Sequence, residues 1–283
     1  MIRIAIQKSG KLTEESLKLI KECGIQINYS NNKLKTTSSN FPLEILFLRD
    51  DDIPGYVEDN IADLGIVGNN IIEEKSKKVK VVKSLGFSKC RLSVAVPKNA
   101  EYKGLKYLQG KNIATSYPNI LGKFLKSKNI QASIHEISGS VEIAPSIGLA
   151  DAIFDIVSSG STLISNGLKE AETVLFSEAV LISNKNLVKE KQKILDDLLF
   201  RIESVQKARG YRYILLNIPN NKIQNAIDIL PGMKSPTILP LADKGWSSLH
   251  SVIHEDDFWK IIGELKKVGA QGILIVPIEK MVV

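Results

Sequence analysis

Short apolar runs alternate with amphipathic stretches along residues 1–208. Over residues 2–6 the apolar side chains recur at every second position, which is the period of a half-buried strand. Apolar positions spaced by three residues between Leu17 and Cys23 then predict the buried face of a helix, with Thr13 as its N-cap and Gly24 as its end. Such alternation is typical of an α/β protein with a largely parallel sheet.

The same alternation predicts the remaining elements of this region. Strands are expected over residues 45–48, 62–67, 79–82, 92–96, 111–115, 133–137, 152–156 and 174–182. Helices are expected from Asp52-Ile53-Pro54, from Pro118, and over 140–149 and 189–207, because proline suits the first turn of a helix. The strands at 79–82 and 92–96 are expected to cross from one lobe to a second. The strand at 174–182 is expected to return the chain to the first lobe. We therefore predict lobe I from residues 1–96 and 174–208, and lobe II from 97–173.

A different pattern follows Gly210. Strands are expected over residues 211–218, 237–241, 248–253 and 272–278, and helices over 222–230 and 256–268. Read in order, this is the β-α-β-β-α-β unit of ferredoxin-like domains. It predicts a separate domain over residues 209–283. Such a domain in an enzyme often senses a small molecule, but a packing or oligomerisation module has the same pattern.

Composition narrows the class of protein. Of the 283 residues, 43% are hydrophobic and 24% charged, so the chain can fill a sizeable core and is not dominantly disordered. No apolar run approaches the ~20 residues of a membrane span. The start turns polar after Ile6, too early for a signal-peptide core, so we expect a cytoplasmic protein without a membrane partner. The net charge of +7 is spread along the chain and aromatics are only 6%, so no nucleic-acid partner is expected.

The most informative stretch runs from Glu142 to Leu163. The strand at 152–156 delivers Asp155 to its carboxyl end, where ligands bind in open α/β sheets. The loop Ser158–Thr162 follows and offers hydroxyls and free N–H groups at a helix start, which suits a phosphate. A carboxylate beside it can accept hydrogen bonds from two vicinal sugar hydroxyls. The stretch predicts a site for a phosphorylated pentose, with an ordinary polar turn as the alternative.

This stretch also resembles a known family. Glu142, Gly148, Ala150, Ile153, Asp155 and Ser159-Gly160-x-Thr162-Leu163 resemble the signature of ATP phosphoribosyltransferase, which opens histidine biosynthesis. Further segments resemble the family in family order, at residues 7–12, 48–55, 63–68, 114–118 and 230–238. The resemblance covers essentially the whole chain and is to the long form, which carries its own regulatory domain. Lys11 departs from it, because family members often have arginine there, and a lysine lacks bidentate phosphate geometry.

The resemblance implies both fold and reaction. The fold would be a two-lobed catalytic part of the type II periplasmic-binding-protein architecture plus a C-terminal ferredoxin-like regulatory domain. The reaction would join N1 of the ATP adenine to C1 of phosphoribosyl pyrophosphate and release pyrophosphate. Adenine N1 has a free lone pair, so no deep general base is needed, and catalysis should rest on positioning and charge stabilisation. Mg²⁺ is expected on the pyrophosphate, held mainly by substrate oxygens and water.

Roles follow from motif positions. The residues implied for catalysis are Asp155, Glu142, Lys8 and Arg49. Those implied for phosphoribosyl pyrophosphate are Asp155, Ser158, Ser159, Gly160, Ser161 and Thr162, and those for ATP are Lys8, Lys11, Arg49 and Tyr117. Other interpretations stay open: solvated loop cations for Lys8 and Lys11, an ion pair with Asp50–Asp52 for Arg49, a core position for Tyr117, and a helix N-terminal charge for Glu142.

The resemblance also implies regulation. Histidine would inhibit by binding the C-terminal domain, with Met233 and Thr237 as the best candidates and Val252 and Gly272 as weaker ones. A homo-oligomer, dimer to hexamer, is implied, with no separate regulatory subunit.

Two other functions compete with this reading. A solute-binding protein would use the same lobes without chemistry, but the missing export signal and the Asp155–Thr162 loop argue against it. A non-catalytic regulatory paralogue is the other, and the presence of Asp155, Gly160, Thr162, Lys8 and Arg49 argues against that.

Overall fold

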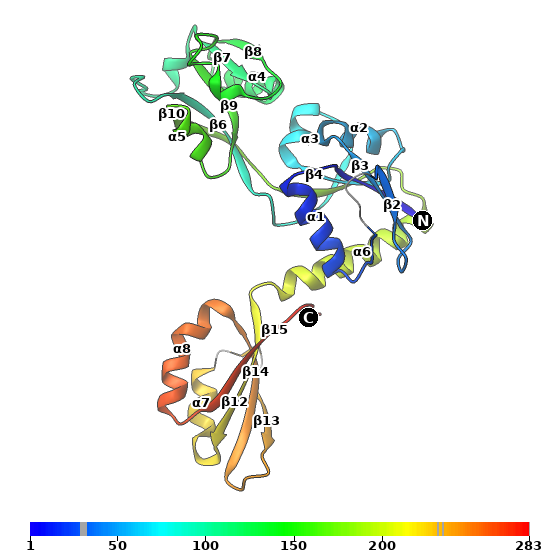
Figure 1. Cartoon of the computed structure of the whole chain (residues 1–283), viewed down its shortest axis with the longest axis vertical. Helices are drawn as coiled ribbons and strands as arrows, with labels where there is room; N and C mark the ends of the chain where they lie inside the picture. Colours follow the sequence, from blue (N-terminus) through cyan, green and yellow to red (C-terminus); the bar gives the residue numbers. More distant parts are fainter. Residues whose placement is uncertain (29–32, 231, 234, 283) are drawn as a thin grey trace. The chain divides into compact units, whose positions relative to one another are not determined.

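The computed structural model describes residues 1–28, 33–230, 232–233 and 235–282 (Figure 1). Pro231, predicted to end a helix, and Lys234, part of a segment that resembles the family, lie outside the described residues. The chain divides into two compact units, Met1–Asp196 and Asp197–Val283. No described helix combines the length and the apolar character that a membrane crossing needs.

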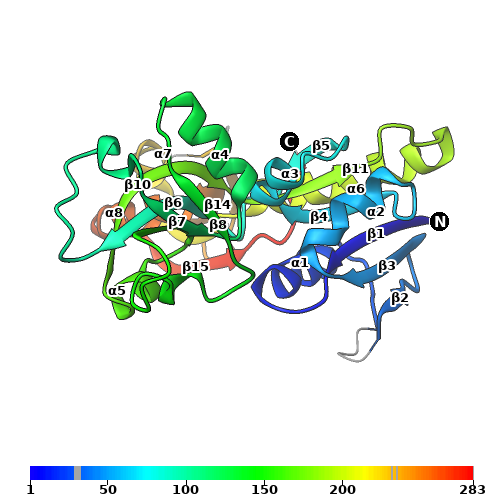
Figure 2. The same ribbon diagram turned by 90° about the horizontal axis from the view of Figure 1, so that it is seen from above.

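The first unit holds two sheets, and the first of them has the strand order β2-β3-β1-β4-β11-β5. Its strands are β1 (Ile2–Gln7), β2 (Lys35–Thr37), β3 (Leu43–Leu48), β4 (Leu64–Gly68), β5 (Lys80–Ser84) and β11 (Ala179–Ser183). Its helices are α1 (Lys11–Glu22), α2 (Ile53–Glu58) and α3 (Asn69–Lys75), all packed against the sheet (Figure 2). Because β1 is parallel to both β3 and β4, the loops that follow these three strands share one edge of the sheet.

The second sheet has the order β10-β6-β9-β7-β8. Its strands are β6 (Cys90–Pro97), β7 (Asn112–Thr115), β8 (Ser133–Glu136), β9 (Ala152–Val157) and β10 (Leu168–Ser177). It carries the helices α4 (Pro118–Ser127) and α5 (Ser161–Ser165) and the short 3-10 turns Leu105–Leu108 and Val141–Ile143. A further 3-10 turn, Asp50–Asp52, lies between β3 and α2 of the first sheet. Strand β7 is parallel to β8 and β9, so Thr115 and Val157 end at the same sheet edge.

The chain passes between the two sheets at residues 85–89 and at Glu178. Strands β6 and β10 pair with each other along their length, so both belong to the second sheet. This differs from the predicted lobe changes at 96/97 and 173/174. In the structure, lobe I is the first sheet with its helices, and lobe II is the second sheet with its helices. An apolar strand looks the same in sequence whichever sheet it joins, and only pairing assigns it.

Three local predictions were wrong. Helix α1 begins at Lys11, after Gly10 with φ 101°, and Thr13 instead donates its hydroxyl hydrogen bond to the Gln7 carbonyl at 2.8 Å. The helix predicted over 140–149 is only the 3-10 turn Val141–Ile143, because Pro145 lacks the N–H that would continue it. The strand predicted over 174–182 is interrupted at Glu178, where β10 ends and β11 begins.

The second unit contains the predicted β-α-β-β-α-β order. Its elements are β12 (Tyr211–Pro219), a 3-10 turn at Asn220–Lys222, α7 (Ile223–Ile229), β13 (Thr237–Pro240), β14 (Trp246–His254), α8 (Glu255–Lys267) and β15 (Gln271–Pro277). The sheet order β13-β14-β12-β15, antiparallel throughout, is that of a ferredoxin-like domain, so the predicted fold class is confirmed. Apolar residues of β12 and β14 pack against α7 and α8 on one face of this sheet. The connecting helix α6 (Lys189–Ala208) begins in the first unit and ends in the second.

Candidate active site

The end of β9 and the loop after it form a small cavity. Its volume is about 140 Å³, and its polar lining consists of Glu142, Asp155, Ser158, Ser159, Gly160 and Thr162. Glu142 comes from the 3-10 turn Val141–Ile143, and the others come from one continuous segment. The structure therefore brings together most of the residues predicted for the phosphorylated pentose. Ser161 does not line the cavity, but its hydroxyl lies 2.9 Å from that of Ser159.

Asp155 is half-buried at the end of β9. Burial raises the pKa of its carboxyl, the hydrogen bond that Asp155 accepts from the Ile156 N–H at 2.8 Å lowers this pKa, and the nearby charge of Glu142 raises it again. The net direction is upward, because removal from water disfavours the charged form most. A carboxylate that water solvates poorly interacts strongly with any positive charge that develops beside it.

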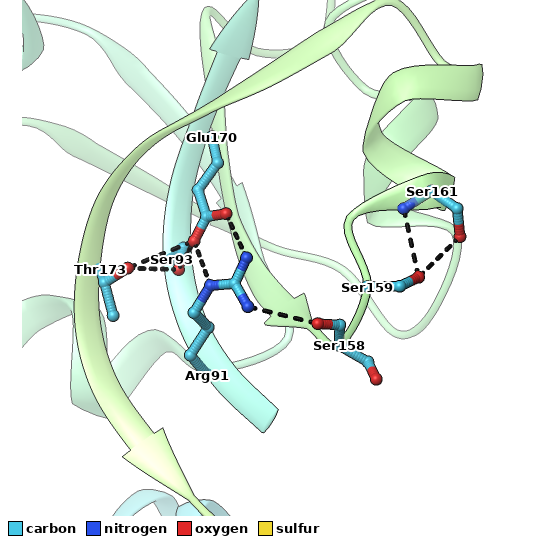
Figure 3. Close-up of polar contacts among 7 residues, drawn as sticks. All are labelled: Arg91, Ser93, Ser158, Ser159, Ser161, Glu170 and Thr173. Atoms are coloured by element: carbon cyan, nitrogen blue, oxygen red, sulfur yellow. Dashed lines mark hydrogen bonds and ion pairs between the residues drawn. The ribbon is translucent and has the colours of Figure 1, made fainter. Parts of the chain in front are cut away.

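Glycine shapes the loop between β9 and α5. Gly160 has φ 81°, in the left-handed region, and is the N-cap of α5. The Ser161 N–H donates to the Ser159 hydroxyl at 3.4 Å, so the turn is held by its own side chains (Figure 3). The result is a tight concave turn with exposed hydroxyls at Ser158 and Thr162.

The sequence analysis missed an arginine that supports this loop. Arg91, on β6, donates to Ser158 through its Nη1 atom, 3.2 Å from the backbone carbonyl oxygen (Figure 3). Its Nε and Nη2 atoms donate to the two Glu170 carboxylate oxygens, each at 2.5 Å. Ser93 and Thr173 donate to the same carboxylate at 2.7 and 3.2 Å. Arg91 and Glu170 are 79 residues apart, so no local pattern connects them.

These donors strongly stabilise the charged carboxylate of Glu170. Its pKa falls to about 2, and the Arg91 hydrogen bond is the largest cause. The bidentate geometry fixes the guanidinium plane and with it the donor to Ser158. The one sequence signal was a cation directly before an apolar strand, and this signal is too common to be diagnostic.

The predicted ATP cations lie in lobe I. The Lys8 N–H donates to the Leu48 carbonyl at 2.8 Å, so the loops after β1 and β3 run side by side and bring Lys8 close to Arg49. Lys11 is the first residue of α1, and the side chains of all three cations are exposed. Among the residues that the structure describes, Arg49 forms no ion pair with Asp50–Asp52, and Asp51 instead pairs with Lys75 at 3.3 Å. The alternative interpretation of Arg49 is therefore not supported.

Tyr117 lies at the start of α4, where its ring packs against the apolar clusters of both sheets. Its pKa is strongly raised, first by burial and then by the charges of Asp155 and Asp50. Its phenol is therefore close to carboxylates of both lobes. The core interpretation therefore describes the ring, and Tyr117 is not among the residues that line the cavity beside Asp155.

The residues predicted for histidine are dispersed within one chain. Thr237 and Val252 lie on adjacent strands, since Thr237 pairs with His250, two residues before Val252. Gly272 is on β15, the opposite edge strand of this sheet, and Met233 lies in an exposed loop. Strand order thus separates Gly272 from Thr237 by two intervening strands. The sequence analysis also missed a polar chain on this sheet, in which His250 contacts the Tyr213 hydroxyl at 3.0 Å and the Ser248 hydroxyl at 2.9 Å.

Mg²⁺ binds oxygen ligands, and carboxylates are the protein groups that usually supply them. Within the described part of the chain no group of three or more His, Cys, Asp or Glu residues could enclose a metal ion. The cavity offers the two carboxylates of Asp155 and Glu142. Mg²⁺ keeps several waters and binds through one or two carboxylates plus substrate phosphates, so these residues fit an ion carried by the substrate.

Comparisons with known proteins identify the family of the chain. The family described as "ATP phosphoribosyltransferase" matches residues 49–204, and "HisG, C-terminal domain" matches residues 208–280. The ATP phosphoribosyltransferase of Cytophaga hutchinsonii is 62% identical over 282 residues, covering 100% of this chain and 99% of the relative. That of Parabacteroides distasonis is 59% identical over 283 residues, covering 100% of both chains.

Solved structures resemble about three quarters of the chain. A chain of the "ATP phosphoribosyl transferase (HisG:HisZ) complex from Thermotoga maritima" is 26% identical, with a TM-score of 0.62, and covers 72% of this chain and 99% of that one. A substrate-binding protein of an amino acid ABC transporter, 13% identical with a TM-score of 0.50, covers 73% of this chain and 93% of that one, and shows the fold alone.

Fold, site and relatives define a two-lobed pentosyltransferase with an appended ferredoxin-like domain. The chain belongs to the ATP phosphoribosyltransferase family of histidine biosynthesis, in its long form.

Proposed function

We propose that this chain joins N1 of the ATP adenine to C1 of phosphoribosyl pyrophosphate. The N1 lone pair forms the new N–C bond while the C1–O bond breaks and its electrons leave with pyrophosphate. The adenine then releases a proton from its exocyclic amino group to water. The observation that carries the proposal is the cavity shared by Asp155, Glu142 and the Ser158–Thr162 loop.

The loop would bind the 5′-phosphate. Ser158, Ser159 and Thr162 supply hydroxyl donors, and Gly160 lets the backbone approach a phosphate closely. Asp155 would accept hydrogen bonds from the ribose hydroxyls. The pentose would thereby be oriented with C1 open to attack, which removes much of the entropic cost of the reaction.

The paired carboxylates would stabilise the transition state. As the C1–O bond stretches, the ribose becomes oxocarbenium-like, and Asp155 and Glu142 place negative charge beside it in a partly desolvated cavity. Lys8, Lys11 and Arg49 would bind the anionic phosphates from lobe I, with Tyr117 beside the adenine. When bound, Mg²⁺ would neutralise charge on the departing pyrophosphate. Substrate oxygens and water would supply most of the ligands of this ion, and Asp155 and Glu142 are the cavity carboxylates that would supply any protein ligand.

Activity is tested directly by incubating the protein with ATP, Mg²⁺ and phosphoribosyl pyrophosphate. The expected products are pyrophosphate and, by mass spectrometry, a phosphoribosyl-ATP adduct. Omission of Mg²⁺ should abolish both, and restoring it should recover them. Pyrophosphate without the adduct would mean hydrolysis and would reject the transfer reaction.

We further propose that histidine inhibits through residues 209–283, in a cytoplasmic homo-oligomer of two to six copies that needs no separate regulatory subunit. Within one chain Gly272 and Thr237 lie on opposite edge strands of the sheet. A pocket that contains both residues would therefore need an edge strand from each of two copies. Such a site would act by favouring one state of the assembly, so inhibition should be non-competitive with phosphoribosyl pyrophosphate.

The regulatory proposal is tested by ending the chain after Ala208, at the end of α6. The truncated protein should stay active and lose inhibition by histidine, whereas the full chain keeps it. Equal inhibition of both forms would reject the assignment of regulation to this domain.

A further inference from the structure

The two lobes of the first unit contact each other through a buried carboxylate. Glu74, on α3, is only 4% exposed. Its Oε1 accepts from the Asn119 N–H and its Oε2 from the Ile120 N–H, both at 3.0 Å. The Asn119 side-chain amide donates back to the Glu74 carbonyl at 3.1 Å. Three hydrogen bonds therefore join α3 of lobe I to the first turn of α4 in lobe II.

This contact supplies α4 with the cap that its own sequence lacks. The first N–H groups of a helix have no partner within the helix and are usually satisfied by a side chain just before it. Tyr117, the N-cap residue of α4, forms no such bond. The cap is instead a carboxylate 45 residues away, which also suits the positive end of the helix. Loss of Glu74 would leave two donors unpaired, which costs more than an ordinary hydrogen bond is worth.

The same contact adjoins the site. Tyr117 directly precedes α4, and its ring packs against the apolar clusters of both lobes. Lys123, one turn further along, donates to the Glu73 carbonyl at 3.4 Å and to the Ser76 hydroxyl at 3.3 Å. Within the described residues, the backbone crosses between the lobes at residues 85–89 and at Glu178. Beside the second crossing, Ser177 of β10 accepts from the Asn70 N–H of α3 at 3.0 Å and donates to the Asn70 side-chain oxygen at 2.8 Å. Polar and apolar contacts thus fix the spacing that the two crossings by themselves would leave adjustable.

We propose that Glu74 is a positioning residue that holds the two lobes at one separation throughout turnover. This rests on the proposed function, because the separation it sets is that between the ATP cations of lobe I and the phosphoribosyl loop of lobe II. The cleft is then preformed, and substrate binding does not have to supply the free energy of a closure. A solute-binding protein that closes on its ligand would need this contact to break and form.

The kinetic test uses Glu74→Gln, which keeps the size of the side chain but replaces one acceptor oxygen by an NH₂ group. A smaller share of the molecules then presents both lobes at the productive spacing, so the KM for ATP should rise by about tenfold. Phosphoribosyl pyrophosphate would be held mainly by the loop of lobe II, with only its pyrophosphate reaching the cations of lobe I. Its Kd, measured by calorimetry without ATP, should therefore rise by less than the KM for ATP. Glu73→Gln, at the exposed neighbour, is the matched control and should change neither value.

Spacing itself is measured with spin labels on cysteines introduced at Lys18 in α1 and Lys126 in α4. Cys23 and Cys90 are replaced by alanine, and labelled chains are diluted with unlabelled ones to suppress distances between copies. The chain with Glu74 should give one narrow distance, identical with and without both substrates. Glu74→Gln should broaden it.

Several outcomes would overturn the proposal. These are a distance that shifts when substrates are added to the chain with Glu74, an unchanged distribution in Glu74→Gln, or an unchanged KM for ATP. Failure of the unaltered chain to form the phosphoribosyl-ATP adduct would instead reject the proposed function, while the spin-label distances would still decide whether Glu74 holds the lobes.

Discussion

The two sides of the predicted site are built in different ways. In lobe II the phosphate loop is held by a glycine turn, by contacts between serine hydroxyls, and by Arg91, which is itself fixed by Glu170. In lobe I the predicted ATP cations are exposed, and Arg49 has no ion pair among the described residues. One side is therefore organised before its ligand arrives, and the other is a set of solvated charges.

This difference matches the chemistry that each side would perform. The pentose carries the reacting carbon, whose position must be accurate within a fraction of an ångström, and a supported loop provides that accuracy. The triphosphate lies away from the bond that forms. Flexible cations can attract it by long-range electrostatics and order around it. Loss of a group on the organised side should therefore affect chemistry, and loss of a group on the other side should affect ATP binding.

The largest effect is expected from Asp155→Asn, which keeps the shape of the side chain and removes its charge. Turnover should fall by about a hundredfold, or about 2.7 kcal/mol, because the oxocarbenium-like centre loses its nearest counter-charge. Steady-state kinetics measure this, and an unchanged circular dichroism spectrum would show that the fold is retained. If the Asp155→Asn variant still binds phosphoribosyl pyrophosphate and turns over as fast as the wild type, Asp155 has a structural role and no catalytic one.

Arg91→Gln should disturb the phosphate loop of lobe II, because it removes the donor to the Ser158 carbonyl oxygen. The Ser158 carbonyl loses its donor and Glu170 loses its partner, so kcat/KM for phosphoribosyl pyrophosphate should fall by about thirtyfold, about 2 kcal/mol. The double variant with Glu170→Gln should recover part of the loss, because it no longer leaves a carboxylate unpaired. An equal fall in kcat/KM for ATP would contradict the assignment of Arg91 and Glu170 to the phosphate loop.

Arg49→Ala tests the solvated side. The resemblance implies a catalytic role for Arg49, but its exposed position predicts that it acts in binding. The KM for ATP should rise by about tenfold with kcat nearly unchanged, the signature of binding lost equally from ground and transition states. Added salt should reduce the difference in the KM for ATP between the variant and the wild type, because salt screens exposed charges. Asp51→Ala, which frees Lys75 from its ion pair, serves as the control for a general change of charge in this loop. A large fall in kcat would place Arg49 on the organised side.

The smallest effect concerns acid stability. The Glu170 pKa is about 2 in the folded protein, below its ordinary value of 4.5, so its contribution is complete above pH 4.5 and is lost as the pH falls toward 2. Because the pair is partly exposed, the contribution should be below about 1 kcal/mol. Urea unfolding of wild type and Glu170→Gln should give free energies that converge over this pH interval. Parallel curves would show that Glu170 is not the group responsible.

Local sequence determined much of this protein. Alternation and helical spacing were sufficient to predict the β-α-β-β-α-β order after Gly210, because β12, β14, α7 and α8 each bury an apolar face. The edge strand β13 is exposed throughout, and there the apolar residues marked the strand without burying it. The segment from Asp155 to Thr162 was readable for a similar reason. Strand, carboxylate, glycine turn and hydroxyls are contiguous, so one stretch of chain carries nearly the whole cavity.

Only the tertiary structure decided what depends on residues far apart in the chain. Pairing between β6 and β10 determined which lobe each strand joins, and it brought Arg91 to Glu170 and to the back of the loop. The cap of α4 likewise comes from Glu74 in the other lobe, although the sequence around Tyr117 contains no sign of it. Hydrogen bonds and ion pairs between distant segments leave no periodic signature, because each requires only two residues and the fold alone sets their separation.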